Sequence, residues 1–326
     1  MRIVFHGQNA ASFSHDFQRL VGEAAQISVL PDALTDPAHS MTYVAADVIV
    51  GGRFSRDLPQ PRQLQLFHVP GAGYDAVDLE AIPDSAVVCN CFGHEQAIAE
   101  YVMAALLERH VPLADADMHL RQGQWNYSAS SAERVHGELA EKTIGLLGFG
   151  HIGKAIAARA KAFEMKVHVA NRSPVPTSSL VDRSFGLNSL GEFWGSADFF
   201  VVSVPSNADT VGIVNADSFA AMRASAVILN VGRGPTIDER SLYEALKDRR
   251  IAGAVIDTWY RYPSADHPIT LPSTLPFHEL PNVVMTPHMS GWTTGTINRR
   301  KLTIADNISR RAAGRPCLNV VRPART

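Results

Sequence analysis

A glycine-rich turn between a predicted strand and a predicted helix is the feature that most constrains how this chain can fold. Residues 143–147 form a short apolar run, Gly148-Phe-Gly150-His-Ile-Gly153 follows, and a helical pattern continues to Phe163. In such a turn the first glycine permits the tight bend, the second lets a pyrophosphate approach the backbone, and the third lets the helix pack closely. The phosphates would bind at the helix N-terminus, where N–H groups and the dipole favour anions. The pattern predicts a dinucleotide-binding fold.

The residues after the next predicted strand favour a phosphorylated dinucleotide. That strand covers residues 166–170, and Asn171-Arg172-Ser173 comes directly after it. An acidic residue at this place accepts hydrogen bonds from the ribose 2′-hydroxyl and repels a 2′-phosphate. Asn171 removes the repulsion, while Arg172 and Ser173 offer a cation and a hydroxyl to the phosphate. We therefore expect NADP(H) to be preferred. In the alternative, the cofactor is NAD and Arg172 stacks on its adenine.

Short β-rich apolar runs alternate with helical patterns along most of the chain, which predicts an α/β protein with parallel sheets. The length of 326 residues favours two domains. A helical run at 94–109 is predicted to bridge them, and a helical stretch at 296–313 to return to the first domain, which makes that domain discontinuous. Strands are expected at 2–5, 27–30, 48–50, 66–69, 87–89, 143–147, 166–170, 199–203, 227–230, 254–256 and 283–285, with further helices at 152–163 and 239–247.

Charge and composition argue against several classes of partner and location. The formal net charge of −2 gives no overall attraction to nucleic acid or to an anionic membrane. The chain begins directly as a predicted strand, without a signal segment, and its apolar stretch at 97–107 carries Glu100 and is too short to span a bilayer. Three cysteines are too few for a disulfide framework, and no clustered ligands predict a metal. We expect a cytoplasmic protein with buried structural thiols at Cys89, Cys91 and Cys317.

Several further motifs, in a fixed order along the chain, carry a resemblance to a known family. They are Gly71-Ala-Gly73-Tyr-Asp75, the glycine turn at 148–153, Asn230-Val-Gly-Arg233-Gly, Gly253-Ala-Val-Ile-Asp257 and Thr286-Pro-His288-Met-Ser-Gly291. With these motifs the chain resembles the D-2-hydroxyacid dehydrogenases, which include glyoxylate/hydroxypyruvate reductases, phosphoglycerate dehydrogenases and D-lactate dehydrogenases. The resemblance implies two Rossmann-like domains, a doubly wound dinucleotide-binding domain at 97–289 inserted into a flavodoxin-like substrate domain at 1–96 and 290–326.

The resemblance also implies a role for each motif. Arg233 would clamp the substrate carboxylate and polarise the C2 carbonyl, which suits a planar guanidinium. His288 would be the general acid/base, because a 2-oxo acid needs a proton on oxygen as hydride reaches carbon. Backbone N–H groups of Ala72 and Gly73 would hold the carboxylate. Asp257 would bind the nicotinamide carboxamide, with a structural cap as the alternative. The remaining cofactor contacts are assigned to His151, Ile152, Val204, Pro205, Val231 and Gly291.

One position departs from the family pattern. The family usually carries Glu five residues beyond the Asp at position 257, where it pairs with the catalytic His, whereas this chain has Tyr262. Formate dehydrogenases of the superfamily carry Gln there, although their other substrate-site residues are not evident in this chain. A neutral phenol can orient an imidazole but cannot stabilise its positive charge as a carboxylate does. The pKa of His288 is therefore expected to be low unless another acid replaces the Glu, and Glu279 is the nearest candidate in sequence.

The predicted function is NADPH-preferring reduction of a 2-oxo acid, such as glyoxylate or hydroxypyruvate, by a homodimer. Arg53 follows a predicted strand near the place where some relatives use a basic residue to bind a substrate phosphate or a second acid group, although a solvated surface arginine is the alternative. A rival from another class is a nucleotide-sensing scaffold like the family's corepressors, with weak turnover. Arg233 and His288 argue against it, because a scaffold has no chemical need for them. A second rival is oxidation of an unusual anion in a pocket reshaped by Arg53 and Tyr262.

Overall fold

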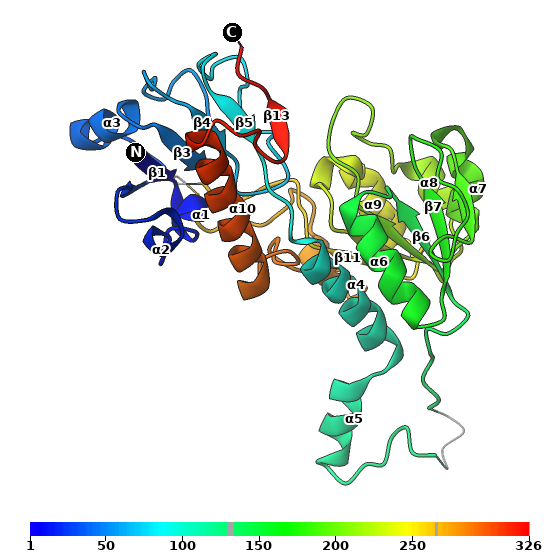
Figure 1. Cartoon of the computed structure of the whole chain (residues 1–326). Helices are drawn as coiled ribbons and strands as arrows, with labels where there is room; N and C mark the ends of the chain where they lie inside the picture. The colour runs from blue at the N-terminus through cyan, green and yellow to red at the C-terminus, as the bar shows by residue number, and fades with distance from the viewer. Residues whose placement is uncertain (130–133, 265–266, 326) are drawn as a thin grey trace. The chain divides into compact units, whose positions relative to one another are not determined.

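A computed structural model of the chain describes residues 1–129, 134–264 and 267–325 (Figure 1). The chain forms two compact units, and each is built around its own mainly or wholly parallel sheet. Unit 1 comprises Met1–Gly93 and Thr293–Thr326, so it is discontinuous in sequence, and unit 2 comprises His94–Trp292. The α/β architecture, with one domain inserted into the other, confirms the predicted fold class.

The described residues of unit 1 form a six-stranded sheet in the order β13-β5-β4-β3-β1-β2. Five strands are parallel, and only the edge strand β13 is antiparallel to its neighbour. The strands are β1 (Arg2–His6), β2 (Gln26–Leu30), β3 (Val48–Gly51), β4 (Leu66–His68), β5 (Val87–Cys89) and β13 (Val320–Arg322). The helices are α1 (Gln8–Ala11), α2 (Gln18–Val21), α3 (Pro37–Val44) and α10 (Thr294–Ala312).

The described residues of unit 2 form a seven-stranded parallel sheet in the order β12-β11-β10-β9-β6-β7-β8. The strands are β6 (Thr143–Leu147), β7 (Lys166–Ala170), β8 (Arg183–Phe185), β9 (Phe199–Val202), β10 (Val227–Asn230), β11 (Gly253–Ile256) and β12 (Val283–Met285). The helices are α4 (Glu95–His110), α5 (Leu113–Leu120), α6 (His151–Ala162), α7 (Leu190–Gly195), α8 (Ala216–Ala221) and α9 (Glu239–Lys247). Short 3₁₀ turns lie at Leu187–Ser189, Gly234–Thr236 and Phe277–Glu279.

Hydrophobic cores cover both faces of the sheet in unit 2. Successive strand residues alternate between them: Val201 packs with α4 and α6 on one face, and Val202 packs with α7 to α9 on the other. A parallel sheet buried in this way needs almost continuous apolar strands, which is the pattern that the sequence shows. Unit 1 is built in the same way, with Ile304 of α10 packed on one face and Tyr43 of α3 on the other.

Two edge strands, β8 and β13, were not predicted from the sequence. Both are three residues long and carry an arginine, so neither shows the apolar run expected of a buried strand. Strand β13 contains the buried Arg322, whose guanidinium donates hydrogen bonds of 2.7–3.0 Å to four backbone carbonyls between Leu79 and Ala86. These bonds satisfy a buried charge that would otherwise be costly. They tie the end of the chain to unit 1.

The three cysteines are free thiols, all in unit 1. Cys89 and Cys91 are buried in one apolar cluster, as predicted, whereas Cys317 is partly exposed at the edge of that cluster. Among the described residues, no helix combines the length and the apolar character needed to cross a membrane. Within the same residues, no group of three or more His, Cys, Asp or Glu side chains is arranged to hold a metal ion.

Candidate active site

Most of the site residues predicted from the sequence lie at one edge of the sheet in unit 2. Parallel strands end at a common edge, and the loops after β6, β7, β9, β10, β11 and β12 all leave the sheet there. The strand order reverses between β6 and β9, which are neighbours in the sheet. Such a switch point is where open α/β sheets form the crevice that binds a ligand.

The glycine turn after β6 has the geometry that its sequence predicts. Gly148 has a φ of +99°, which favours glycine. A Cβ on Gly153 would lie 2.4 Å from the carbonyl oxygen of Gly148, so only glycine lets α6 pack this closely. A Cβ on Gly150 would meet no atom within 4 Å, which leaves open space beside the backbone. Gly150 is the N-cap of α6 and provides no side-chain cap. These residues fit a bound pyrophosphate.

The segment after β7 is hydrogen-bonded to the glycine turn. Asn171 Oδ1 accepts a hydrogen bond of 3.3 Å from the backbone N–H of Phe149 in the glycine turn, and its Nδ2 donates to the carbonyl of Ser173. Asn171 is therefore a structural link between two loops as well as a neutral residue at the expected acidic position. The side chains of Arg172 and Ser173 are exposed beside it. Their position leaves them accessible to a ligand.

Arg233 follows β10, and its partly buried side chain donates a hydrogen bond of 2.9 Å to the carbonyl of Gly232. The glycines on each side of Arg233 allow two close backbone contacts. A Cβ on Gly234 would lie 2.1 Å from the carbonyl oxygen of Trp259, and one on Gly232 would lie 2.9 Å from that of Val204. These two glycines let the loop pack against the neighbouring chain, and the packing positions Arg233.

Asp257, at the end of β11, is fully buried and holds the loop after β12. Its Oδ1 accepts hydrogen bonds from Thr286 Oγ1 at 2.6 Å and from the Met289 N–H at 2.8 Å, and its Oδ2 accepts from the Ser290 N–H at 2.9 Å. These bonds correspond to the structural cap that the sequence left open as the alternative role of Asp257. Because the loop contains His288, the carboxylate fixes the backbone on which that residue lies.

His288 and Tyr262 form a hydrogen-bonded pair. The phenol oxygen lies 3.0 Å from Nδ1 of the imidazole, and it accepts a hydrogen bond of 3.1 Å from the backbone N–H of Trp259. His288 has a φ of +59°, a left-handed conformation that few residues adopt and that histidine tolerates better than most. The tyrosine thus occupies the position beside the imidazole that the family gives to Glu.

The surroundings of His288 lower its pKa below the ordinary value. The largest cause is desolvation of the ring, and the positive charge of Arg233 acts in the same direction. The carboxylate of Asp257 opposes both effects without reversing them. Glu279, the candidate named from sequence, instead faces the ring of His278 at 3.9 Å. The low pKa expected from the Tyr262 substitution therefore agrees with the surroundings of the ring, where desolvation outweighs the charge of Asp257.

The other predicted residues of unit 2 lie around the same edge. His151 and Ile152 form the first turn of α6, Val204 and Pro205 follow β9, and Val231 is buried after β10. Gly291 packs on α4, where a Cβ would lie 3.3 Å from the Cβ of His94. Sequence reasoning missed Tyr101 of α4, whose hydroxyl lies 2.7 Å from Thr286 Oγ1. No motif marks this tyrosine, because its partner is 185 residues away.

Three predicted substrate residues belong to unit 1. The carbonyl of Ala72 accepts a hydrogen bond of 2.7 Å from Asn90 Nδ2, which fixes the loop that also contains the exposed Gly73. Arg53 is exposed after β3 and pairs with Asp57 Oδ2 at 2.5 Å, a contact between residues four apart on the surface. This pair favours the solvated surface arginine over a substrate ligand at this position.

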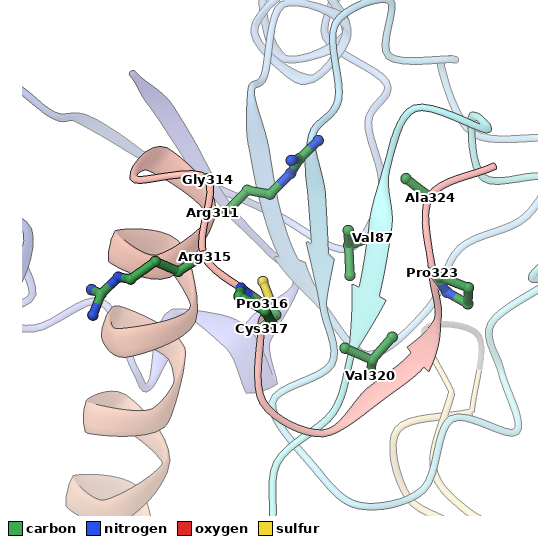
Figure 2. Close-up of a pocket in the computed structure, with 9 residues that line it drawn as sticks. All are labelled: Val87, Arg311, Gly314, Arg315, Pro316, Cys317, Val320, Pro323 and Ala324. Carbon is green, nitrogen blue, oxygen red and sulfur yellow. The ribbon is translucent and has the colours of Figure 1, made fainter. Parts of the chain in front are cut away.

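A cavity of about 310 Å³ lies elsewhere in unit 1, between the end of α10 and the strands β5 and β13 (Figure 2). Its lining is mostly apolar, and Arg311, which borders it, already donates to the carbonyls of Gln65 and Ser85. None of the residues assigned to the site from sequence lines this cavity. We therefore place the candidate site at the sheet edge of unit 2 and not here.

Comparison with known proteins agrees with this geometry. The family model "D-isomer specific 2-hydroxyacid dehydrogenase, NAD binding domain" matches residues 102–290, more than half of the chain. The chain is 30% identical over 287 residues to the D-3-phosphoglycerate dehydrogenase of Methanocaldococcus jannaschii, with 85% of this chain and 52% of that protein covered. It is also 30% identical over 284 residues to the hydroxypyruvate reductase of Thermotoga maritima, with 86% of each covered.

A solved structure gives the same result over the full length. The NADPH-dependent glyoxylate/hydroxypyruvate reductase of Sinorhizobium meliloti, solved with NADP and malonate, has a TM-score of 0.77 and 26% identity, and covers 100% of this chain and 98% of its own. Several phosphoglycerate dehydrogenases that match are about twice as long, since this chain spans only about half of their length. On these matches, the chain belongs to the D-isomer specific 2-hydroxyacid dehydrogenase family, NAD-dependent oxidoreductases that act on CH–OH groups.

Proposed function

We propose that this enzyme reduces a small 2-oxo acid of the glyoxylate or hydroxypyruvate type and prefers NADPH. The observation that carries the proposal is that the glycine turn, Arg233 and His288 leave one edge of one parallel sheet. A dinucleotide bound on the turn after β6 would extend along this edge toward the loops after β10 and β12. The names of the matched hydroxypyruvate reductase and glyoxylate/hydroxypyruvate reductase support this substrate class.

Each residue then has a defined task. Bound NADPH supplies the hydride that C2 of the substrate receives. Arg233 binds the substrate carboxylate and polarises the carbonyl through paired N–H donors. The imidazole of His288 delivers a proton to the carbonyl oxygen, and Tyr262 orients the ring through Nδ1.

The cofactor preference rests on the segment after β7. Asn171 places no negative charge where the 2′-phosphate of NADP would lie, and Arg172 offers an exposed guanidinium. A charged phosphate contact of this kind contributes about 1.5–3 kcal/mol. The S. meliloti relative, which is NADPH-dependent and bound to NADP, supports the same preference.

We further propose a homodimer formed through the arm that follows α4. This arm, α5 and the segment behind it, exposes Leu113, Met118, Leu120 and Trp125 at 74, 49, 50 and 73% of their surface. Several large apolar side chains exposed along one short segment are typical of a protein interface. Sedimentation of the wild type and of Leu113→Glu/Trp125→Glu tests it. A wild-type monomer would contradict the proposal.

The deciding experiment for the activity is a panel of 2-oxo acids assayed with NADPH and with NADH. We expect reduction of glyoxylate or hydroxypyruvate, and a decrease in kcat of about 10²–10⁴-fold in His288→Ala with cofactor binding retained. A protein that binds NADPH tightly but reduces none of the acids would instead be a nucleotide-sensing scaffold. Near-normal turnover in His288→Ala would mean that another residue supplies the proton.

A further inference from the structure

The imidazole of His288 is paired with a neutral group, the phenol of Tyr262, which can either donate or accept the hydrogen bond between them. A carboxylate can only accept from Nδ1, so it favours a ring that carries a proton there and stabilises the imidazolium. The phenol of Tyr262, 3.0 Å from Nδ1, can accept a hydrogen bond or donate one. Its oxygen already accepts from the Trp259 N–H, so the pair is held in place without any charge.

The charged groups that face the ring do not replace the missing carboxylate. Asp257 is the one that favours a charged imidazole, but its two oxygens already accept three hydrogen bonds from Thr286, Met289 and Ser290. Arg233 acts in the opposite sense and disfavours a second positive charge. Within the described residues, no carboxylate accepts a hydrogen bond from His288. The neutral phenol at Nδ1 and the desolvation of the ring both favour a neutral imidazole, in agreement with its lowered pKa.

A neutral imidazole suits a substrate with an iminium group at C2 better than one with a ketone at C2. Reduction of a ketone leaves an alkoxide, so a proton must reach oxygen as hydride reaches carbon, and the imidazolium has to supply it. An iminium ion already carries its proton. When hydride forms the new bond to C2, the π pair of C=N becomes the lone pair of an amine, and no proton moves in that step. The amine later takes a proton from water. An imidazolium would repel such a cation, whereas a neutral Nε2 can accept its N–H.

We propose that this site also reduces 2-imino acids, which bind as iminium ions between the carboxylate clamp of Arg233 and a neutral His288 oriented by Tyr262, to give 2-amino acids. The proposal rests on the proposed function, because the same clamp and the same cofactor serve both substrates. It adds a different requirement. Formation of the hydroxy acid needs the proton of His288, whereas formation of the amino acid does not.

The test uses one carbon skeleton for both reactions. The best 2-oxo acid is incubated with NADPH deuterated at its transferred position, with and without methylamine, and both products are quantified by mass spectrometry. We expect a deuterated hydroxy acid without the amine and a deuterated N-methyl amino acid with it. His288→Ala should reduce hydroxy acid formation about 10²–10⁴-fold and amino acid formation less than about tenfold. Arg233→Ala should reduce both, because both substrates carry the carboxylate.

Tyr262→Glu is the matched variant, because it keeps His288 and replaces its neutral partner with a carboxylate. The new carboxylate favours the imidazolium, so above neutral pH hydroxy acid formation should rise and amino acid formation should fall relative to wild type. The proposal is overturned if the wild type yields hydroxy acid but no amino acid, or if His288→Ala reduces both products equally. If neither product forms although NADPH binds, the proposed function fails together with this inference. Titration of NADPH fluorescence shows in every variant that the cofactor site is intact.

Discussion

The carboxylate of Asp257 accepts the backbone N–H of Ser290 at 2.9 Å, and both groups are buried. The same carboxylate accepts the N–H of Met289 and the hydroxyl of Thr286, so it replaces water for three donors on both sides of His288. A charged acceptor inside the protein makes strong bonds to such donors and is costly to remove. This relationship makes Asp257 the residue that holds the loop after β12 in its left-handed turn at His288.

Asp257→Asn should therefore lower both stability and turnover. An amide can present only one acceptor oxygen, so at least one buried N–H loses its partner, which costs about 1–3 kcal/mol. We expect a lower urea midpoint and a larger decrease in kcat than in NADPH affinity. Asp238→Asn is the control, because Asp238 accepts the Ser241 N–H as an exposed N-cap of α9, where Asn serves almost equally well. Equal midpoints for Asp257→Asn and wild type would contradict the assignment.

Two glycines of the turn after β6 should respond differently to alanine. In Gly153→Ala the new methyl group would lie 2.4 Å from the carbonyl oxygen of Gly148, so α6 must shift and stability should fall by more than about 1 kcal/mol. In Gly150→Ala the methyl group meets no protein atom, so the protein should fold normally but bind NADPH at least about tenfold more weakly. Thermal melts and fluorescence titration separate the two effects. Tight NADPH binding by Gly150→Ala would place the pyrophosphate elsewhere.

The sequence predicted the central strands well for a physical reason. Strands such as β6 and β10 are buried on both faces and therefore read as continuous apolar runs. The edge strands β8 and β13 lack such runs, and the hydrogen bonds of Arg322 that accompany β13 reach residues more than 230 positions away. Local pattern cannot reveal a strand whose stability depends on distant partners.

In the candidate site, too, local sequence predicted some features, and others depend on distant partners. The residue types of the motifs predicted chemistry, and the contact of Tyr262 with His288 followed from the spacing of one family motif. The sequence left the role of Asp257 open between a nicotinamide contact and a structural cap, because the cap depends on three donors that the fold brings together from another loop. Sequence likewise gave no reason for Gly234 to pack on the carbonyl of Trp259.

Arg172 should determine the choice between NADPH and NADH. Its exposed guanidinium follows β7 with Asn171 beside it, where a 2′-phosphate would bind. Arg172→Ala should raise KM for NADPH by about 10–100-fold, equivalent to 1.5–3 kcal/mol, with little change for NADH. Arg183→Ala, which removes another arginine of the same unit that pairs with Glu192, is the control and should leave both constants unchanged. An equal rise for both cofactors would indicate stacking on adenine.

His68 should make the folded state sensitive to acid. It is fully buried; its Nε2 lies 3.0 Å from the Asn307 amide nitrogen and its Nδ1 lies 3.1 Å from the Val69 carbonyl, which together fix a neutral tautomer. Burial lowers its pKa from 6.5 to about 4. Above pH 6.5 the ring is neutral in both states, and as pH falls from 6.5 toward 4 only the unfolded state takes up the proton. Folding should therefore lose on the order of 3 kcal/mol across this window through His68.

Urea unfolding at several pH values tests this prediction. His68→Gln keeps polar groups at the site but does not titrate, so its stability should decline less steeply between pH 6.5 and 4 than that of the wild type. The slope is the informative quantity, because the substitution also lowers stability at every pH. His15→Gln, at an exposed histidine of the same unit, is the matched control. Parallel slopes for His68→Gln and wild type would mean that His68 is already charged in the folded protein.

The pH dependence of 2-oxo acid reduction should report the neutral partner of His288. Reduction needs the imidazolium, and desolvation together with the charge of Arg233 lowers the pKa of the ring. The rate should therefore decline as pH rises past this lowered pKa, while oxidation of the hydroxy acid, which needs the neutral base, should remain active to lower pH. A carboxylate beside an imidazole commonly raises its pKa by about 1–3 units. In Tyr262→Glu the alkaline limb of the reduction profile should move upward accordingly.

Tyr262→Phe separates charge from orientation in this experiment. It removes the hydrogen bond to Nδ1 without adding a charge, so kcat should fall. The alkaline limb of its reduction profile should not show the upward shift expected in Tyr262→Glu. The measurement is kcat/KM for reduction between about pH 5 and 10, which covers the ordinary imidazole range of about pH 5–8 and the upward shift expected in Tyr262→Glu. Superimposable profiles for wild type and Tyr262→Glu would show that Asp257 already provides the charge that His288 requires. The neutral dyad would then have no consequence for proton transfer, because the buried carboxylate behind the loop would set the protonation state of the ring.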